Sequence, residues 1–233
     1  MGTIVAVCGF DEFEHIWALA IHIRSLTGKE HPNFLLIPTT QFDVPNPGTL
    51  NCYYKLGCEV DTLKPSEWWV TPEIIRQKTE WADIIWVPGG NLKYCRNTWE
   101  KTGVAEAVKQ AYDRGAVVCG GSAGAMIWFR SGFDNCAVYD EKEFTPGLGF
   151  YPYVICPHYE CEGWQCFNEE VKNQPLPGFA IEDGAALCVP PNGDAYVFRA
   201  EGTEKVWFFD PAAGFEKTEF TGGKLIRPRT SET

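Results

Sequence analysis

One stretch of the sequence, residues 116–129, restricts the fold more than any other. An apolar run with β-branched residues meets a cluster of glycines around a serine, and apolar residues then return. This pattern indicates a buried strand, a very tight turn and the start of a helix. The spacing Gly120-x-Ser122-x-Gly124 is typical of a nucleophile elbow, in which small neighbours let the backbone bend sharply and expose the serine hydroxyl. The alternative is a glycine-rich loop whose serine only caps the following helix.

The first half of the chain predicts strands alternating with helices. Thr71-Pro72-Glu73 is a strong helix start, because it combines a capping residue, a proline in the first turn and an early acid. The intervening apolar runs are continuous rather than alternating, which favours a mostly parallel, doubly wound sheet covered on both faces. Two glycine-bearing loops, 88–91 and 120–124, follow strands of this sheet. Because ligands of such sheets bind beyond the carboxyl ends of the strands, we expect the two loops to lie together at the functional site. The expected strands cover residues 3–8, 34–38, 59–63, 84–87 and 116–120.

The last hundred residues have a different character. Short apolar runs are separated by proline and glycine turns, and residues 196–199 and 206–209 are predicted to be paired strands. We expect this part to be β-rich and to pack on the same sheet, so that residues 1–233 form a single domain. The polar tail 224–233 is expected to fray.

Composition excludes several classes of partner. The net charge of −11 argues against nucleic acid and against anionic membrane surfaces. No signal peptide is evident, no apolar run is long enough to span a membrane, and the ten cysteines include no Cys-x-x-Cys pair. A reduced, cytoplasmic protein is therefore expected.

No cofactor or metal is predicted. The first strand-to-helix turn lacks a phosphate-binding glycine motif. Cys156, Cys161 and Cys166 surround His158, but their five-residue spacing is poor for zinc.

An activated serine needs a base, and the base needs a carboxylate that orients it. Of the four histidines, His158 is the best candidate because it follows an apolar run in the constrained loop Pro157-His158-Tyr159. The orienting acid stays open between Asp134 and the pair Glu182 and Asp183. Only thirty-six positions separate Ser122 from His158, which disfavours an ordinary esterase or lipase.

Four segments together resemble the peptidase E family of serine peptidases, which includes the cyanophycinases. They are Pro88-Gly-Gly-Asn91, Gly121-Ser-Ala-Gly-Ala125, Gly147-Leu-Gly-Phe150 followed by Pro157-His158, and Ile181-Glu-Asp-Gly-Ala-Ala-Leu187. The resemblance extends over residues 3–210. It implies a glutamine-amidotransferase-like, flavodoxin-like α/β fold.

The resemblance also implies roles for individual residues. Ser122 would be the nucleophile, His158 the base and Asp134 the orienting acid. The oxyanion hole would consist of the main-chain N–H groups of Gly90 and Ala123.

The family prefers peptides with an N-terminal aspartate, which calls for a cation beside the substrate. Relatives carry an arginine shortly after the histidine motif, but here Lys172 is the first cation after His158. Asn91, Lys93 and Arg96 are the substrate-binding candidates.

The sequence therefore predicts a serine peptidase that acts on short peptides, and the resemblance implies dipeptides with an N-terminal aspartate as substrates. The alternative from another class is a catalytically inactive relative that binds a small acidic ligand or a partner protein. An amidotransferase-like enzyme is a third reading, but such enzymes carry cysteine at the elbow. A small peptide is the expected partner as substrate, and a homodimer is the candidate assembly.

Overall fold

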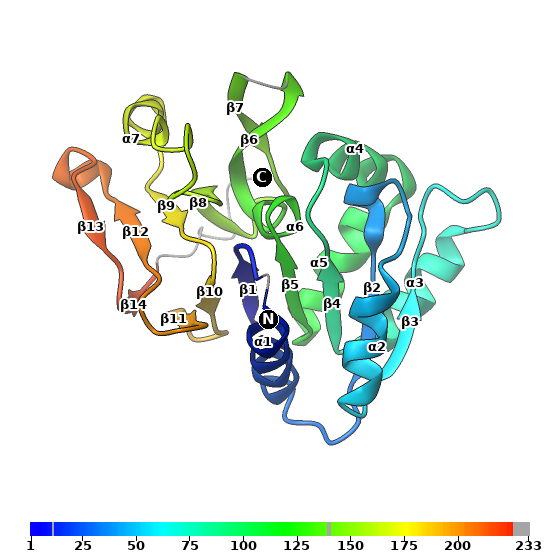
Figure 1. Ribbon diagram of the computed structural model, residues 1–233. Helices are drawn as coiled ribbons and strands as arrows, with labels where there is room; N and C mark the ends of the chain where they lie inside the picture. The colour runs from blue at the N-terminus through cyan, green and yellow to red at the C-terminus, as the bar shows by residue number, and fades with distance from the viewer. Residues whose placement is uncertain (11, 139–140, 226–233) are drawn as a thin grey trace.

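Figure 1 shows the computed structural model, which describes residues 1–10, 12–138 and 141–225. In the first half of the chain, strands alternate with helices as predicted. These elements are β1 (Ile4–Val7), α1 (Phe13–Ser25), β2 (Asn33–Leu36), η1 (Pro38–Gln41), α2 (Pro47–Lys55), β3 (Glu59–Thr62), α3 (Pro72–Trp81), β4 (Ile84–Val87), α4 (Leu92–Thr102), α5 (Val104–Arg114) and β5 (Val117–Gly121).

The second half is mostly strand. It comprises α6 (Ala123–Met126), β6 (Phe129–Val138), β7 (Glu141–Pro146), β8 (Tyr151–Cys156), α7 (Phe167–Glu170), η2 (Val171–Asn173), β9 (Gly178–Ile181), β10 (Ala185–Val189), β11 (Asp194–Arg199), β12 (Val206–Phe209), η3 (Pro211–Ala213), β13 (Lys217–Glu219) and β14 (Gly222–Lys224).

Local sequence signals account for several of the helix ends. The side chain of Thr71 caps α3 by accepting a hydrogen bond from the Ile74 N–H, and Pro72 occupies the first turn. Gly115 ends α5 in the left-handed conformation, with φ of 115°. The helix start predicted at residues 71–73 is thus present.

The described strands form two sheets, of eight and six strands. The larger has the order β14-β11-β10-β1-β5-β4-β2-β3, and its five strands from the first half of the chain are parallel. Helices α1 and α2 cover one face and α3, α4 and α5 the other (Figure 1). Alternate residues of β1 enter the two cores, Ile4 and Ala6 on one side and Val5 and Val7 on the other, which explains its continuous apolar run.

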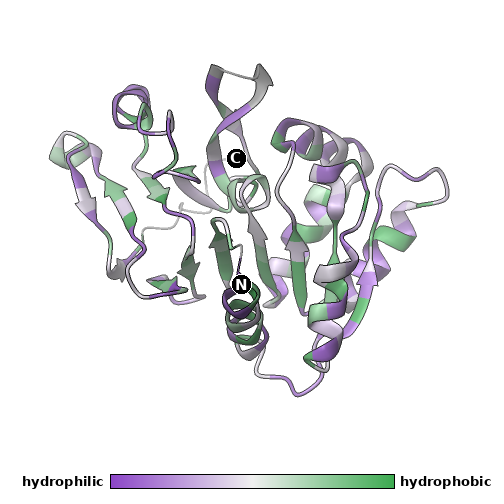
Figure 2. Ribbon diagram, viewed as in Figure 1, coloured by the Kyte–Doolittle hydropathy of each residue, from purple (hydrophilic) through white to green (hydrophobic). Residues whose placement is uncertain are grey.

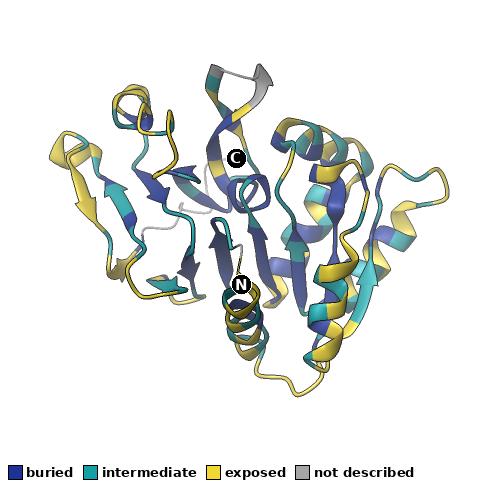
Figure 3. Ribbon diagram, viewed as in Figure 1, coloured by how far each residue is buried: buried dark blue, intermediate teal, exposed yellow. Residues whose placement is uncertain are grey.

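The central strands are the most apolar and the most deeply buried part of the molecule. Figure 2 shows β1, β4 and β5 as largely hydrophobic, and Figure 3 shows them buried, whereas the outer faces of α1 and α2 are exposed. Residues that follow these strands are therefore fixed by a rigid scaffold.

The β-rich half differs from the expectation in one respect. Only β10, β11 and β14 extend the first sheet, while β6–β9, β12 and β13 form a second one. The predicted pairing of residues 196–199 with 206–209 is wrong: β11 pairs with β10 and β14, and β12 pairs with β9 and β13. Both segments have strand-forming composition, but long-range pairing assigns them to different sheets. The more specific flavodoxin-like description stays a prediction.

The tail also begins later than expected. Lys224 ends β14 and Leu225 is buried, so neither is frayed. Residues 226–233 lie outside the described residues. Within the part of the chain that the structure describes, no helix is both long enough and apolar enough to cross a membrane.

Candidate active site

Ser122 lies at the sharp turn between β5 and α6. Its backbone has φ of 52° and ψ of −114°, a conformation that costs a non-glycine residue about 1–3 kcal/mol. The N–H of Ser122 donates to the Val7 carbonyl at 3.0 Å, which ties the turn to the end of β1. This is the strained strand-to-helix geometry that the sequence pattern predicts.

The glycines on either side of Ser122 are required by close packing against the end of β4. A Cβ atom at Gly124 would lie 1.9 Å from the Val87 carbonyl oxygen, and one at Gly120 would lie 2.3 Å from the same oxygen. Such distances cannot occur without moving backbone. The two glycines therefore let the elbow approach β4, beside the loop that follows it.

Gly124→Ala is expected to lower the free energy of unfolding by about 3 kcal/mol or more, because the added methyl group overlaps main-chain atoms. Gly121→Ala is the matched control, since a Cβ atom there would meet nothing within 4 Å, and its effect should stay below about 1 kcal/mol. Urea unfolding of the two variants measures the difference. Equal losses of stability would show that this packing argument does not hold.

His158 reaches Ser122 from the second sheet. It follows β8, its φ is 55°, and its Nε2 atom lies 3.0 Å from the Ser122 Oγ. The next residue is anchored as well, because the Tyr159 N–H donates to the Ile181 carbonyl at 3.1 Å. The site therefore joins the carboxyl end of β5 in one sheet to the carboxyl end of β8 in the other.

Asp183 completes a chain of hydrogen bonds. Its Oδ1 lies 2.7 Å from the His158 Nδ1. Burial raises the pKa of Asp183, but hydrogen bonds from His158 and Cys8 outweigh burial, and the net pKa lies below its ordinary value. An ionised carboxylate can only accept, so Nδ1 carries the imidazole proton and Nε2 is left to accept one from the Ser122 hydroxyl.

Asp183 replaces Asp134, the first choice from the sequence, as the carboxylate placed on the His158 Nδ1 atom. Asp134 lies within β6, paired in register with Glu143 of β7, and its side chain is only 2 % exposed. Asp183 instead occupies the turn between β9 and β10, which faces the imidazole.

The other alternative for the acid, Glu182, is held elsewhere. Its carboxylate accepts hydrogen bonds from the Trp207 Nε1 at 2.9 Å and from the Lys205 N–H at 2.8 Å. Both partners lie on or beside β12, so Glu182 ties the turn after β9 to the second sheet. It acts as an anchor for the turn that carries Asp183.

Cys8, which no sequence motif singled out, contacts both His158 and Asp183. The thiol donates to the Asp183 Oδ1 at 3.1 Å and accepts from the His158 main-chain N–H at 2.8 Å. Burial raises the pKa of Cys8 far above its ordinary value, and the negative charge of Asp183 adds to this, so the group stays a thiol. Its position could have identified it, because Cys8 follows β1 directly and the carboxyl ends of the parallel strands line the site.

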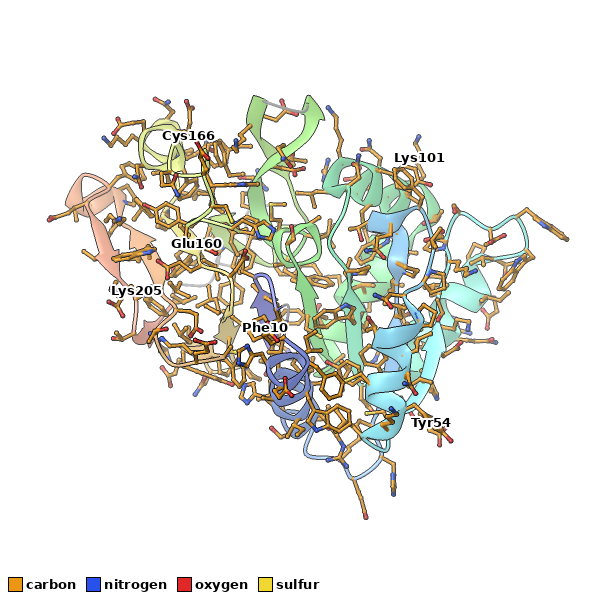
Figure 4. All side chains as sticks on the ribbon, viewed as in Figure 1. Phe10, Tyr54, Lys101, Glu160, Cys166 and Lys205 are labelled. Atoms are coloured by element: carbon orange, nitrogen blue, oxygen red, sulfur yellow. The ribbon has the colours of Figure 1, made fainter. Side chains whose placement is uncertain are left out.

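Glu160 is a second carboxylate next to Asp183. Its Oε1 accepts from the Asp183 N–H at 2.8 Å, and Figure 4 shows it on the loop after β8, above β1. Burial raises the pKa of Glu160, and the charge of Asp183 acts in the same direction. The main chain of Asp183 is thus fixed by the same loop that carries His158.

The loop after β4 lies against Ser122, as expected from the parallel sheet. A Cβ atom at Gly89 would be 3.3 Å from the Ser122 Cβ. Thr40 fixes this loop: its carbonyl accepts from the Asn91 N–H at 2.8 Å, and its hydroxyl donates to the Pro88 carbonyl at 2.7 Å. Gly90 has φ of 136°, and any Cβ there would collide with the Thr40 carbonyl.

Ala123 is the first residue of α6 and directly follows Ser122, so its main-chain N–H lies in the turn at Ser122. Within the described residues, it donates to no protein acceptor. The two predicted oxyanion-hole residues, Gly90 and Ala123, thus lie in loops that meet at Ser122.

The three predicted substrate-binding residues have partners of their own. Asn91 caps α4 through its Oδ1, which accepts from the Tyr94 N–H at 2.8 Å. Lys93 lies 3.9 Å from the Glu143 carboxylate, and Arg96 lies 2.6 Å from that of Glu100. Lys93 and Arg96 also line a cavity of about 250 Å³ between α4 and β7.

Comparison with known proteins gives a consistent result. The model of Peptidase family S51 matches residues 4–194. The uncharacterized peptidase YgaJ of Bacillus subtilis (strain 168) is 29% identical over 174 residues, which is 71% of this chain and 73% of that protein.

Two solved structures are similar in fold. A peptidase from an acI-B1 Actinobacterium has a TM-score of 0.69 at 19% identity and covers 97% of both chains. A candidate peptidase E protein from Listeria monocytogenes EGD-e has a TM-score of 0.64 at 17% identity, covering 85% of this chain and 98% of its own.

Proposed function

The chain belongs to peptidase family S51 and is a serine peptidase, and from that premise we propose that it hydrolyses short peptides with Ser122, His158 and Asp183 as its catalytic triad. The observation that carries the proposal is the continuous path from the Ser122 Oγ through the imidazole to the Asp183 carboxylate, with distances of 3.0 and 2.7 Å. Nucleophile, base and orienting acid are within hydrogen-bond reach in the order that acyl transfer requires.

In the first half of the reaction, His158 Nε2 takes the hydroxyl proton while the Ser122 oxygen attacks the scissile carbonyl. The negative charge that develops on the carbonyl oxygen would be stabilised by the N–H groups of Gly90 and Ala123, each worth about 3 kcal/mol in comparable sites. Nε2 then gives its proton to the departing amine, and the acyl group remains on Ser122.

In the second half, water takes the place of the amine. His158 Nε2 accepts a proton from the water as the water oxygen attacks the acyl carbon. It then returns a proton to the Ser122 oxygen as the bond between that oxygen and the acyl carbon breaks, which releases the carboxylic acid product and restores the Ser122 hydroxyl. Throughout, Asp183 holds the proton on Nδ1 and balances the imidazolium charge. Every proton and bond in these steps is supplied by the chain, the peptide and one water molecule.

The resemblance to peptidase E suggests dipeptides with an N-terminal aspartate as substrates. Lys93 and Arg96 are already paired with carboxylates, which weakens them as partners for an acidic side chain. The carboxylate of Asp183 contacts the imidazole on the side away from Ser122, and Glu160 contacts the Asp183 main chain. Their negative charge near the site instead favours the α-ammonium group of a peptide. We therefore propose a free N-terminus as the first requirement, with aspartate preference as the narrower expectation.

We further propose that the reaction takes place in the cytoplasm. The nine cysteines within the described residues are all free thiols, as is usual in a reducing compartment. The alternative is an inactive, ligand-binding relative, and the contact between the Asp183 carboxylate and His158 supports the active peptidase instead.

A serine-directed phosphonate tests the proposal. One equivalent is expected to attach to each chain, with peptide mapping placing it on Ser122, and His158→Ala should label far more slowly. A panel of dipeptides that differ in their first residue, each with a free or an acetylated N-terminus, then defines specificity. Unlabelled Ser122 under conditions that label a control serine hydrolase would contradict the assignment.

A further inference from the structure

Three different kinds of metal ligand converge behind the nucleophile. The Cys8 sulfur, the His158 Nδ1 and an Asp183 carboxylate oxygen all lie within 4.8 Å of one another. The separations are 3.7 Å from sulfur to nitrogen, 3.1 Å from sulfur to oxygen and 2.7 Å from nitrogen to oxygen. Thiolate, imidazole and carboxylate are the ligands that Zn²⁺ prefers in proteins.

The spacing is close to what a tetrahedral ion requires. Zinc bonds of about 2.0–2.3 Å place neighbouring ligand atoms about 3.4–3.6 Å apart. The sulfur-to-nitrogen separation already fits, and the two separations to oxygen need to widen by less than about 1 Å. The hydrogen bonds from Cys8 and His158 to the Asp183 Oδ1 atom form two sides of this triangle, and a bound ion would replace both.

A fourth ligand and an entry route lie on the solvent side. The Cys161 sulfur is 3.7 Å from the Asp183 Oδ2, and Glu160, Cys161 and Asp183 form a second group within 4.8 Å. Cys161 is exposed, and the side chains of His158 and Asp183 are 28% and 32% exposed. Asp183 belongs to both groups, so an ion can approach the buried Cys8 from the solvent side, past Cys161 and Asp183.

We propose that Cys8, His158 and Asp183 form a binding site for a thiophilic divalent cation of the Zn²⁺ class, and that its occupation switches the peptidase off. Binding breaks the Cys8 S–H bond and releases that proton to water as the metal–sulfur bond forms. The imidazole proton moves from Nδ1 to Nε2 as Nδ1 becomes a ligand. Nε2 then donates to the Ser122 oxygen instead of accepting its proton, so the base is lost. The inhibitory consequence rests on the proposed function, but metal binding does not.

Metal binding is best measured on full-length Ser122→Ala protein, which keeps all the ligands and is independent of turnover. Titration with Cd²⁺ should give one ion per chain and the ultraviolet absorbance of a cadmium–thiolate bond. The Nδ1 resonance of ¹⁵N-labelled His158 should shift at the same equivalence point. Cys8→Ala should weaken binding by more than about 100-fold, because loss of even an outer partner of a metal ligand typically costs about 10–100-fold.

The control is Cys166→Ala, because Cys166 is an exposed thiol that Figure 4 places beside α7, away from Glu160. It should leave Cd²⁺ affinity within about twofold of the parent. Cys8→Ser keeps a hydrogen-bonding side chain but removes the sulfur ligand, so it should lose Cd²⁺ affinity as Cys8→Ala does. It also provides the test if the alanine variant does not fold.

Two results would overturn the proposed metal site. One is Cd²⁺ binding by Cys8→Ser that is as tight as in the parent, and the other is an unchanged His158 Nδ1 resonance at saturating Cd²⁺. In the active protein, Zn²⁺ should also stop phosphonate labelling of Ser122, and a chelator should restore it. Labelling that continues with the site filled would overturn the switch, whereas absence of labelling without metal would count against the proposed function alone.

Discussion

Ser122→Ala is expected to lower kcat by at least about 10⁴-fold, since removal of the nucleophile from a serine peptidase leaves only binding and oxyanion stabilisation. KM should change little, because the methyl group leaves the surrounding loops in place. The measurement is steady-state hydrolysis of the best dipeptide found in the substrate panel. Retention of more than about one per cent of activity would exclude Ser122 as the nucleophile.

Substitutions of Ser122 also test whether the backbone of this turn is strained. Alanine must adopt the φ of 52° just as serine does, whereas glycine reaches that region freely. Ser122→Gly should therefore be about 1 kcal/mol more stable than Ser122→Ala, although glycine elsewhere usually destabilises. Thermal or urea unfolding of the two inactive variants provides the comparison. A more stable alanine variant would mean that the turn is not strained.

The structural features predicted correctly from the sequence are those that depend on local patterns of neighbouring residues. The glycines around Ser122 indicated a tight turn, and the loop at His158 was recognisable from its proline. The continuous apolar runs indicated the buried strands β1, β4 and β5. The meeting of the loops after β4 and β5 followed from one general rule, that the carboxyl ends of neighbouring parallel strands share an edge. Local patterns thus predicted the sharp turn at Ser122, the loop that carries His158 and the surrounding parallel sheet.

The choice among Asp134, Glu182 and Asp183 as the carboxylate beside His158 could not be made in this way, because the position of that carboxylate depends on register between distant strands. Parallel pairing of β8 with β9 sets Cys156 opposite Ala180, so that His158 and the turn carrying Asp183 emerge side by side. Antiparallel pairing of β1 with β10 sets Val7 opposite Ala186, which brings Cys8 to the same turn. Neither pairing has a signature in one sequence, and the same limitation produced the mistaken pairing of β11 with β12.

Asp183→Ala is expected to lower kcat by about 10⁴-fold, because loss of the acid in known triads costs this much. Without an acceptor at Nδ1, the imidazole loses its preferred tautomer and its orientation toward Ser122. Asp134→Ala is the matched control. It removes a buried carboxylate and should reduce stability, yet kcat per phosphonate-reactive site should stay within about tenfold of the parent. The reverse ranking of the two variants would restore Asp134 as the catalytic acid.

Asp183→Asn separates charge from geometry at the same atom. The Cys8 thiol donates to Oδ1, so it favours the amide conformer that places oxygen rather than nitrogen there. That oxygen can still accept from Nδ1, which preserves the base on Nε2. Asp183→Asn should therefore keep more activity than Asp183→Ala, and combining it with Cys8→Ala should remove the advantage. If asparagine were as damaging as alanine with Cys8 intact, the thiol would have no part in orienting this side chain, and charge alone would explain the role of Asp183.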